Sequence, residues 1–201
     1  MTQQQKTHRL AVSAMLTAVA AVLQFLEFSI PLVPSFIKLD FSDLPALLGT
    51  FSLGPVYGVA IQLAKNLLHL PFGSSAGVGE LSNFILGAVF VFVAGIIYKH
   101  NKSRKSALVG SVAGAASMAL VSIVTNYFIV YPAYVVLYKL PLEAIVGMYE
   151  AILGGVSHVP TQNALLNCLL VFNVPFTLVK GLLDTALCFL IYKPLSPLLH
   201  R

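Results

Sequence analysis

Long runs of apolar residues, separated by short polar stretches, dominate the pattern along this chain of 201 residues. A helix that crosses the hydrocarbon core of a bilayer needs roughly 20 mostly apolar residues. Four runs are long enough, at residues 9–28, 80–98, 106–137 and 168–192. The pattern therefore predicts an all-α protein that crosses a membrane several times.

A further apolar region, residues 43–70, is interrupted at Gly54 and Pro55. Because proline lacks a backbone N–H and ends or kinks a helix, we expect two shorter helices here, at 43–53 and 55–70. The first is too short to span a bilayer alone, so it must be buried against protein. With the four long runs this gives six membrane helices, and the segment 139–167 becomes a loop that could be partly helical.

The positions of the basic residues favour this count. Loops on the cytoplasmic side of a membrane carry an excess of Lys and Arg. With six helices, both termini and the loop KHNKSRK at residues 99–105 lie on one side, which we assign to the cytoplasm. Eight of the twelve Lys and Arg residues then lie on that side: Lys6, Arg9, Lys99, Lys102, Arg104, Lys105, Lys193 and Arg201. The loops 29–42 and 139–167 are accordingly external.

Composition excludes several other classes of protein. Hydrophobic residues make up 58% of the chain and charged residues only 9%, against about 25% charged in a typical soluble domain. A soluble enzyme and a disordered chain are therefore excluded, and we expect a single integral membrane domain over residues 1–201. The net charge of +5 is assigned to membrane topology, not to nucleic-acid binding. Cys168 and Cys188 would lie ~30 Å apart on one helix, so we expect no disulfide.

Polar groups inside the expected helices are the candidate functional residues, because ionisable side chains are costly in hydrocarbon and usually mark a site. The set comprises Lys65, Glu80, Asn83, Asn126, Asn173, Lys180 and Asp184. The predicted topology gathers most of these groups in the outer half of the membrane and leaves the inner halves of the helices nearly free of charge. This distribution predicts a ligand pocket open to the outside, not a continuous polar path.

Each polar residue also has a purely structural interpretation. Lys180 and Asp184 are four residues apart on one helix and could neutralise each other. Lys65 could pair with Glu80 or extend its ammonium to the membrane surface. Asn126 could form a hydrogen bond between helices.

Small residues recur at four-residue spacing in two places. Ala14 and Ala18 lie in the first expected helix, and Gly110 and Gly114 lie in the helix at 106–137. Faces of this kind let two helices approach closely. Such a face could pack inside this chain, or it could dock against another membrane protein.

Motifs for catalysis and nucleotide binding are absent. The chain has no GxxxxGK[ST], HExxH or CxxC sequence, so it cannot hold ATP phosphates in a P-loop. We therefore expect no catalytic residues, no bound metal and no resident cofactor. A small channel or an intramembrane enzyme is the alternative from another class. A channel would need polar residues in both halves of the membrane, and an enzyme would need a nucleophile beside a base.

Four segments carry a resemblance to a known family. KLDFSDLPALLG, GVGELSNF, TNYFIVYPAY and NVPFTLVKGLLD occur in this order along nearly the whole chain. In these motifs the chain resembles the riboflavin-specific S components of energy-coupling-factor (ECF) vitamin transporters. The resemblance implies a subunit in the cell membrane of a bacterium that captures riboflavin from outside. It would work with a transmembrane T subunit and two ABC ATPases, and would be neither an enzyme nor a nucleic-acid-binding protein.

The resemblance also implies roles for individual residues. The flavin pocket of the family uses an Asn that falls on Asn126 in TNYF, a Lys that falls on Lys180 in LVKG, and a Glu that falls on Glu80 in GVGEL. The family's contact with the T subunit falls on Ala14 and Ala18. Further candidates for ligand contact are Asp40 in the gate-like loop 29–42, Lys65 and Asn83 for the ribityl hydroxyls, Tyr131 for the ring, and Asn173 and Asp184. An S component for flavin mononucleotide (FMN), thiamine, folate or a biotin-like compound remains the alternative ligand class.

Overall fold

The computed structural model describes residues 2–73, 75–139, 141–152 and 163–199. Its elements in chain order are α1 (Gln3–Phe25), β1 (Phe28–Ser29), β2 (Lys38–Leu39), α2 (Asp43–Leu53), α3 (Pro55–His69), α4 (Val78–His100), α5 (Arg104–Thr125), the π-helical segment η1 (Asn126–Val130), α6 (Tyr131–Tyr138), α7 (Leu142–Ile152), α8 (Ala164–Cys168), the π-helical segment η2 (Leu169–Asn173) and α9 (Val174–Leu199). The predicted all-α class is confirmed, since the two paired strands hold only two residues each.

Four helical stretches are long and apolar enough to cross a membrane: Gln3–Phe25, Val78–His100, Arg104–Tyr138 and Ala164–Tyr192. The third joins α5, η1 and α6 into one rod, and the fourth joins α8, η2 and most of α9. Helix α1 begins at Gln3, ahead of the expected residue 9, because Thr2 and Gln5 form a capping box that satisfies backbone N–H groups at the helix start.

The apolar region 43–70 forms two helices that meet at Gly54. The backbone of Gly54 has φ = 114°, a conformation that is strained for residues with a Cβ atom. Pro55 then begins α3, where its missing N–H would have had no helical partner. Helix α2 is buried from Asp43 to Phe51, as expected for a half-helix that is held by protein instead of lipid.

The segment 139–167 is not a simple loop. It contains α7 and the start of α8, while residues 153–162 lie outside the described part of the chain. Ile145 and Tyr149 are four residues apart on one face of α7, and both are buried in a hydrophobic cluster that also includes Val130 and Leu169. The amphipathic face explains why this segment folds as a helix.

The two stripes of small residues have different environments. Gly110 and Gly114 allow α5 to pack directly on α4: an added Cβ at Gly114 would lie 2.5 Å from the carbonyl oxygen of Phe90. For this stripe, packing inside the chain is the correct interpretation. Ala14 and Ala18 are exposed on α1, whereas Leu16 on the other face is buried. The alanine face is therefore available to a partner.

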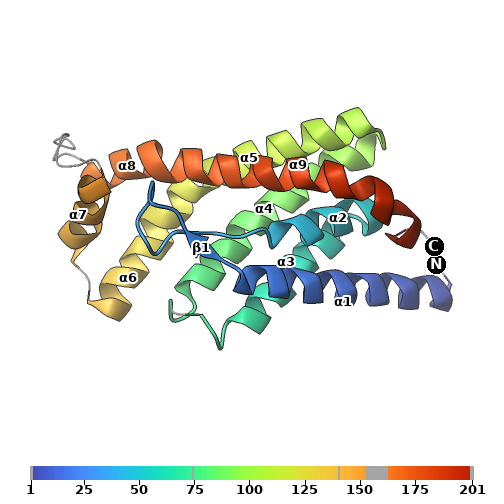
Figure 1. The fold of residues 1–201 in the computed structure, drawn as a ribbon, viewed down its shortest axis with the longest axis horizontal. Coiled ribbons are helices and arrows are strands. Elements are labelled where there is room, and N and C mark those ends of the chain that lie inside the picture. The colour runs from blue at the N-terminus through green and yellow to red at the C-terminus, as the bar shows by residue number, and fades with distance from the viewer. Residues whose placement is uncertain (1, 74, 140, 153–162, 200–201) are drawn as a thin grey trace.

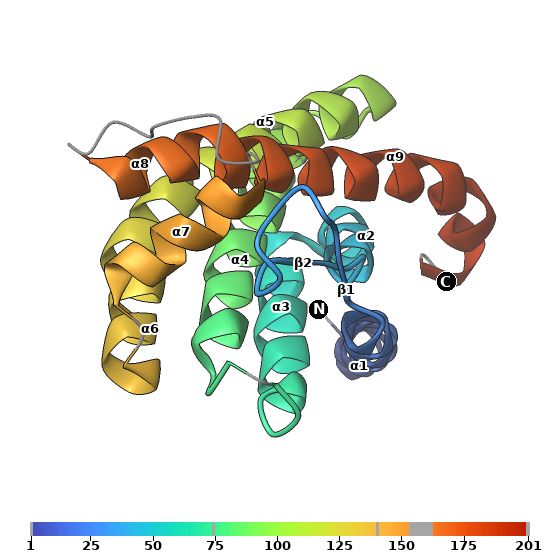
Figure 2. The same cartoon turned by 60° about the vertical axis from the view of Figure 1, so that its left-hand side comes forward.

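The molecule has two distinct ends. Both termini and the turn between α4 and α5 lie at one end, and α6 and α7 lie at the other (Figure 1). The segment that joins α1 to α2 carries β1 and β2, whose antiparallel register pairs Phe28 with Leu39. Figure 2 shows this segment looping toward α7 and α9. It therefore brings residues from early in the chain beside residues from its last helix.

Close packing at Gly114 yields a stability prediction. Gly114→Ala places a Cβ against backbone that cannot rotate away, so we expect a loss of about 1–3 kcal/mol in the free energy of unfolding. Gly147→Ala in α7 is the control, because nothing lies within 4 Å of its added Cβ. Thermal unfolding in mild detergent measures both. Equal stability of the two variants would contradict the packing argument.

Candidate functional site

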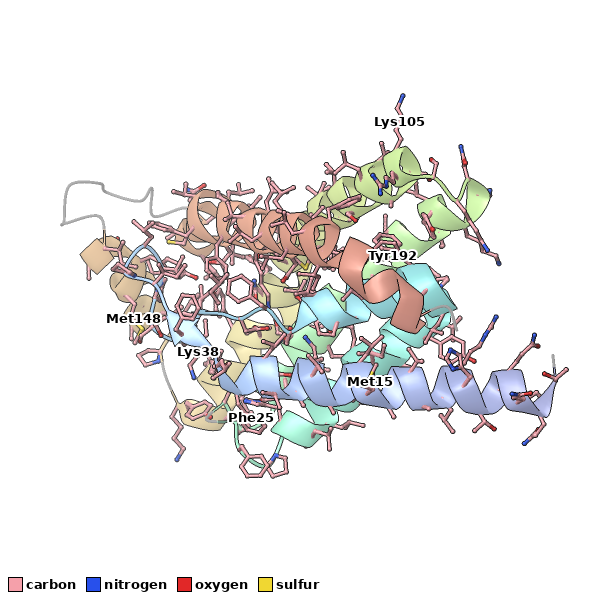
Figure 3. All side chains as sticks on the ribbon, turned by 45° about the vertical axis from the view of Figure 1, so that its right-hand side comes forward. Met15, Phe25, Lys38, Lys105, Met148 and Tyr192 are labelled. Carbon is pink, nitrogen blue, oxygen red and sulfur yellow. The ribbon has the colours of Figure 1, made fainter. Side chains whose placement is uncertain are left out.

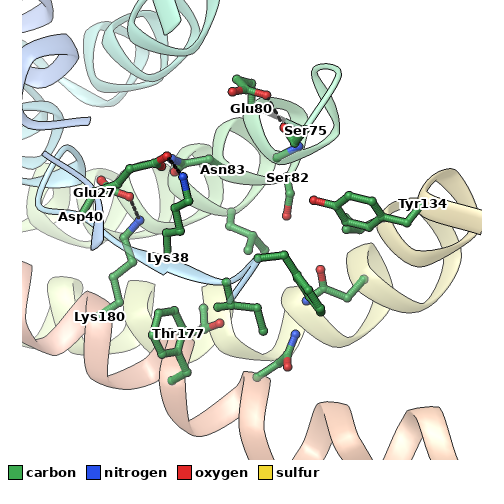
Figure 4. Close-up of a pocket in the computed structure, with 18 of the residues that line it drawn as sticks. Glu27, Lys38, Asp40, Ser75, Glu80, Ser82, Asn83, Tyr134, Thr177 and Lys180 are labelled. Atoms are coloured by element: carbon green, nitrogen blue, oxygen red, sulfur yellow. Dashed lines mark hydrogen bonds and ion pairs between the residues drawn. The ribbon is translucent and has the colours of Figure 1, made fainter. Parts of the chain in front are cut away.

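A cavity of about 420 Å³ lies among the end of α1, the β1–β2 segment, α3, α4, η1, α6, α7 and α9, within the size range of small-molecule sites. Apolar side chains form much of its wall: Phe36, Ile37, Leu86, Met118, Ile145 and Phe176. Figure 4 shows the polar side chains that enter it from opposite sides. The cavity thus combines an apolar wall with many polar and charged side chains.

Two π-helical segments place asparagines at the cavity. Asn126 is the first residue of η1 and Asn173 is the last residue of η2, and both line the cavity and are buried. A π-helical turn shifts the hydrogen-bonding pattern of a helix locally and is frequent at functional sites. Each long helical rod therefore has its π-helical segment at the point where it presents an asparagine to the cavity.

Several polar groups that line the cavity have no hydrogen-bond partner among the described residues. These groups belong to Asn83, Asn126, Thr177, Ser82 and Tyr134. The Asn126 amide can both donate and accept, and its side chain is only 7% exposed. Because buried polar groups are normally satisfied, this amide is the strongest candidate for a bond to a ligand.

Asn173 and Tyr131 are already engaged with each other. The Tyr149 hydroxyl donates to Oδ1 of Asn173 at 2.7 Å, and Nδ2 of Asn173 donates to the Tyr131 hydroxyl at 3.1 Å. The two tyrosine hydroxyls are also hydrogen-bonded to each other. Burial raises the pKa of the Tyr149 hydroxyl, so Tyr149 stays a donor at neutral pH. This triad fixes α7 as one wall of the cavity.

Lys180 enters the cavity from α9 and pairs with acids from the other side. Its Nζ lies 2.8 Å from Oδ2 of Asp40 and 3.3 Å from Oδ2 of Asp43, and the bond to Asp40 is visible in Figure 4. Burial alone would raise the pKa of the Asp40 carboxyl, but the ammonium groups of Lys180 and Lys65 outweigh burial and hold that pKa below its usual value. The direct ion-pair partners of Lys180 are therefore Asp40 and Asp43, and Asp184, the residue that could have neutralised it along the helix, is not one of them.

Lys65 and Asp184 do not line the cavity. Lys65 is fully buried, its Nζ lies 2.7 Å from Oδ1 of Asp43, and it also bonds Ser42. It does not pair with Glu80. Asp184 is fully buried and neither carboxyl oxygen has a hydrogen-bond partner among the described residues. These two residues belong to the packing around the site, not to its surface.

Glu80 lines the cavity together with His69. An oxygen of Glu80 lies 2.9 Å from Nδ1 of His69, and the other accepts from the Ser75 hydroxyl at 2.7 Å. This group joins the end of α3 to the start of α4. His69 was not among the predicted site residues, because a lone histidine at a helix end gives no sequence signal for a carboxylate partner eleven residues later.

Other lining residues were also missed from the sequence. Thr177 lies four residues after Asn173 and three before Lys180, so the helical repeat already places it on the same face. Glu27 and Lys38 form an ion pair at the edge of the cavity. No sequence pattern predicts that pair, because the turn of the α1–α2 segment brings it together.

The fold and this cavity define a multi-pass membrane protein with a ligand-sized, partly polar site. The sequence profile described as "ECF transporter, substrate-specific component" matches residues 8–192. The chain therefore belongs to the family of substrate-specific S components of ECF transporters, and it is a multi-pass protein of the cell membrane.

Individual relatives agree with this assignment. The riboflavin transporter RibU of Staphylococcus aureus is 34% identical over 98% of this chain and 95% of its own length. The riboflavin transporter FmnP of Bacillus subtilis is 31% identical over 98% of this chain and 96% of its own length. A solved structure described as the S component of a bacterial ECF transporter is 36% identical, with a TM-score of 0.73, and the match covers 99% of this chain and 100% of that one.

The ion pairs around Asp43 predict a large effect of removing its charge. Asp43→Asn leaves two buried lysines short of a counter-charge, and breaking a buried pair costs about 3–5 kcal/mol of unfolding free energy. Glu27→Gln is the matched control, because its partner Lys38 is partly exposed and such a pair contributes about 0–1 kcal/mol. Unfolding in detergent measures both; losses of the same size would argue against the buried network.

Proposed function

We propose that this chain is the riboflavin-binding S component of an ECF transporter and that its ligand occupies the 420 Å³ cavity. The observation that carries the proposal is the buried Asn126 amide, which lines the cavity without a hydrogen-bond partner among the described residues. The riboflavin transporters among its relatives, similar over nearly the full length, support the choice of ligand.

The chemistry of the cavity suits a flavin. Isoalloxazine is a flat, largely apolar ring system with one edge of carbonyls and an N–H. The Asn126 amide complements that edge because it donates and accepts. The Lys180 ammonium donates to a ring carbonyl while it keeps its bond to Asp40.

The remaining lining residues suit the rest of the ligand. Phe36 packs edge-on against Tyr131 at 6.0 Å between ring centroids, and this pair encloses the ring. The ribityl hydroxyls meet Asn83, Thr177 and Glu80. FMN shares the ring and is the second ligand to test.

We assign six membrane segments to the chain, with α2 and α3 as a buried pair of short helices. Both termini and the α4–α5 turn lie at one end of the molecule (Figure 1), and the positive-inside rule places that basic end in the cytoplasm. The cavity, which lies toward α6 and α7, then opens toward the external side. Riboflavin is thus captured from outside the cell.

Inward delivery requires partners, and we assign this role to an ECF T subunit and two ABC ATPases. The chain has no P-loop sequence. Ala14 and Ala18 form an exposed small-residue face on α1, the kind of face on which another membrane helix packs closely. We place the T subunit on this face.

Substitutions in the cavity test the ligand and the site together. Asn126→Ala, Lys180→Ala and Thr177→Val should each weaken riboflavin binding by about 1–3 kcal/mol, or about 5- to 150-fold in Kd, because each leaves a polar partner on the flavin unpaired. Fluorescence quenching of riboflavin by purified protein in detergent measures the Kd.

The control variants are Asn101→Ala and Lys105→Ala, which are exposed and outside the cavity and should bind as the parent does. Thr177→Val keeps the shape of the side chain, so it separates lost binding from lost folding. Unchanged Kd values in all three cavity variants would refute the site, and tighter binding of thiamine or biotin than of riboflavin would refute the ligand.

Bulky residues on the alanine face should separate binding from uptake. Ala14→Leu with Ala18→Leu should abolish riboflavin uptake by cells and leave the Kd of the purified protein unchanged, because the face is exposed and far from the ligand. Ala116→Leu on α5, also exposed, is the control and should spare both. Loss of binding in the double variant would instead make this face part of the folded core.

A further inference from the structure

A second cavity, of about 370 Å³, lies at the other end of the molecule from the first. It is bounded by the ends of α2 and α4, by the start of α5 and by residues 188–192 of α9. Its floor is aromatic: Phe51 and Tyr98 pack edge-on with ring centroids 4.9 Å apart, and Phe189 lies beside them in the lining. Nothing in the proposed capture of riboflavin uses this cavity.

The charged side chains among the described residues that line this cavity are all basic. Lys102 and Arg104 line it, both are exposed, and neither forms an ion pair with another described residue. No acidic side chain is among the described residues that line it. The cavity therefore offers two cationic groups beside an apolar floor, which complements a ligand that is anionic at one end and apolar at the other.

The position of the cavity favours a lipid as that ligand. Leu190 lines the cavity and is 73% exposed, and it lies two residues before the end of the stretch Ala164–Tyr192, which is long and apolar enough to cross the membrane. One side of the cavity is therefore continuous with the surface that faces acyl chains. The other side is the basic α4–α5 turn, at the level of the headgroups.

From this geometry we propose that the cavity is a binding site for an anionic phospholipid. The phosphate contacts Lys102 and Arg104, and the upper part of an acyl chain lies on Phe51, Phe189 and Leu190. Basic pockets between membrane helices on the cytoplasmic side are sites of this kind. That this cavity lies on the cytoplasmic side rests on the proposed topology. That basic and apolar side chains lie side by side in its lining does not depend on that topology.

The experiment is a titration of the purified full chain in neutral detergent with phosphatidylglycerol, followed by native mass spectrometry. Phosphatidylcholine is titrated in parallel, and inorganic phosphate is added as a competitor. We expect the protein to retain phosphatidylglycerol in preference to phosphatidylcholine. Lys102→Gln with Arg104→Gln should weaken that retention about 10-fold or more, since each basic group near an anionic lipid contributes appreciably.

The matched control is Lys99→Gln with Lys105→Gln. Like the first double variant, it removes two positive charges near the connection between α4 and α5. Neither residue lines the cavity, and Lys105 points away from the molecule in Figure 3. Retention should stay within about 2-fold of the parent. Riboflavin binding by each variant reports that the protein is folded.

Three results would overturn the proposal. Equal losses in the two double variants would reduce the effect to general surface charge. Competition by inorganic phosphate at equal concentration would show an anion site with no role for the acyl chain. Unchanged lipid retention in Lys102→Gln, Arg104→Gln, together with loss of co-purification with the transporter's membrane partner, would assign the cavity to a protein contact instead.

Discussion

The structure depends on one buried ionic contact, the carboxylate of Asp43 between two lysines. Lys65 of α3 bonds one oxygen, and Lys180 of α9 approaches the other while it bonds Asp40. Isolated charges in a membrane domain are costly, so each group is tolerated only while the others are in place. The contact therefore fixes the short helix α2, the preceding loop and the last helix relative to one another, and these elements form the base of the ligand cavity.

The rest of the cavity is assembled around this base by contacts of a different kind. Tyr131, Tyr149 and Asn173 form a closed set of hydrogen bonds that attaches α7 to the two long helical rods that contain η1 and η2. Phe36 packs edge-on against the same tyrosines, so the α1–α2 segment and α7 meet at the cavity. Polar groups that are not consumed in these contacts, above all the Asn126 amide, remain for the ligand. This division explains how a site can be rigid and still offer free hydrogen-bonding groups.

The proposed ligand site, partner contact and lipid site lie on separate surfaces of the same fold. Gly110 and Gly114 on α5 pack against α4 inside the chain, whereas Ala14 and Ala18 on α1 are exposed. The proposed riboflavin cavity and the proposed lipid site lie at opposite ends, and the alanine face runs along α1 between them. Binding, docking to a transporter and anchoring in a leaflet are thus assigned to residues that do not overlap, which is why single substitutions can separate them.

The sequence by itself determined the membrane class, the long helices, the break at Gly54 and some of the polar residues that line the cavity, because apolar run length and the helical repeat are local properties. Tertiary structure decided which charges meet. The nearest acid to Lys180 along the helix is Asp184, yet Lys180 bonds Asp40, 140 residues away in the chain. The tertiary structure also brings Asn173 into hydrogen bonds with Tyr131 and Tyr149, and it places Glu80 within hydrogen-bonding distance of His69. Such pairings follow from how the helices and the α1–α2 segment pack, and packing depends on the whole three-dimensional arrangement instead of on spacing along one helix.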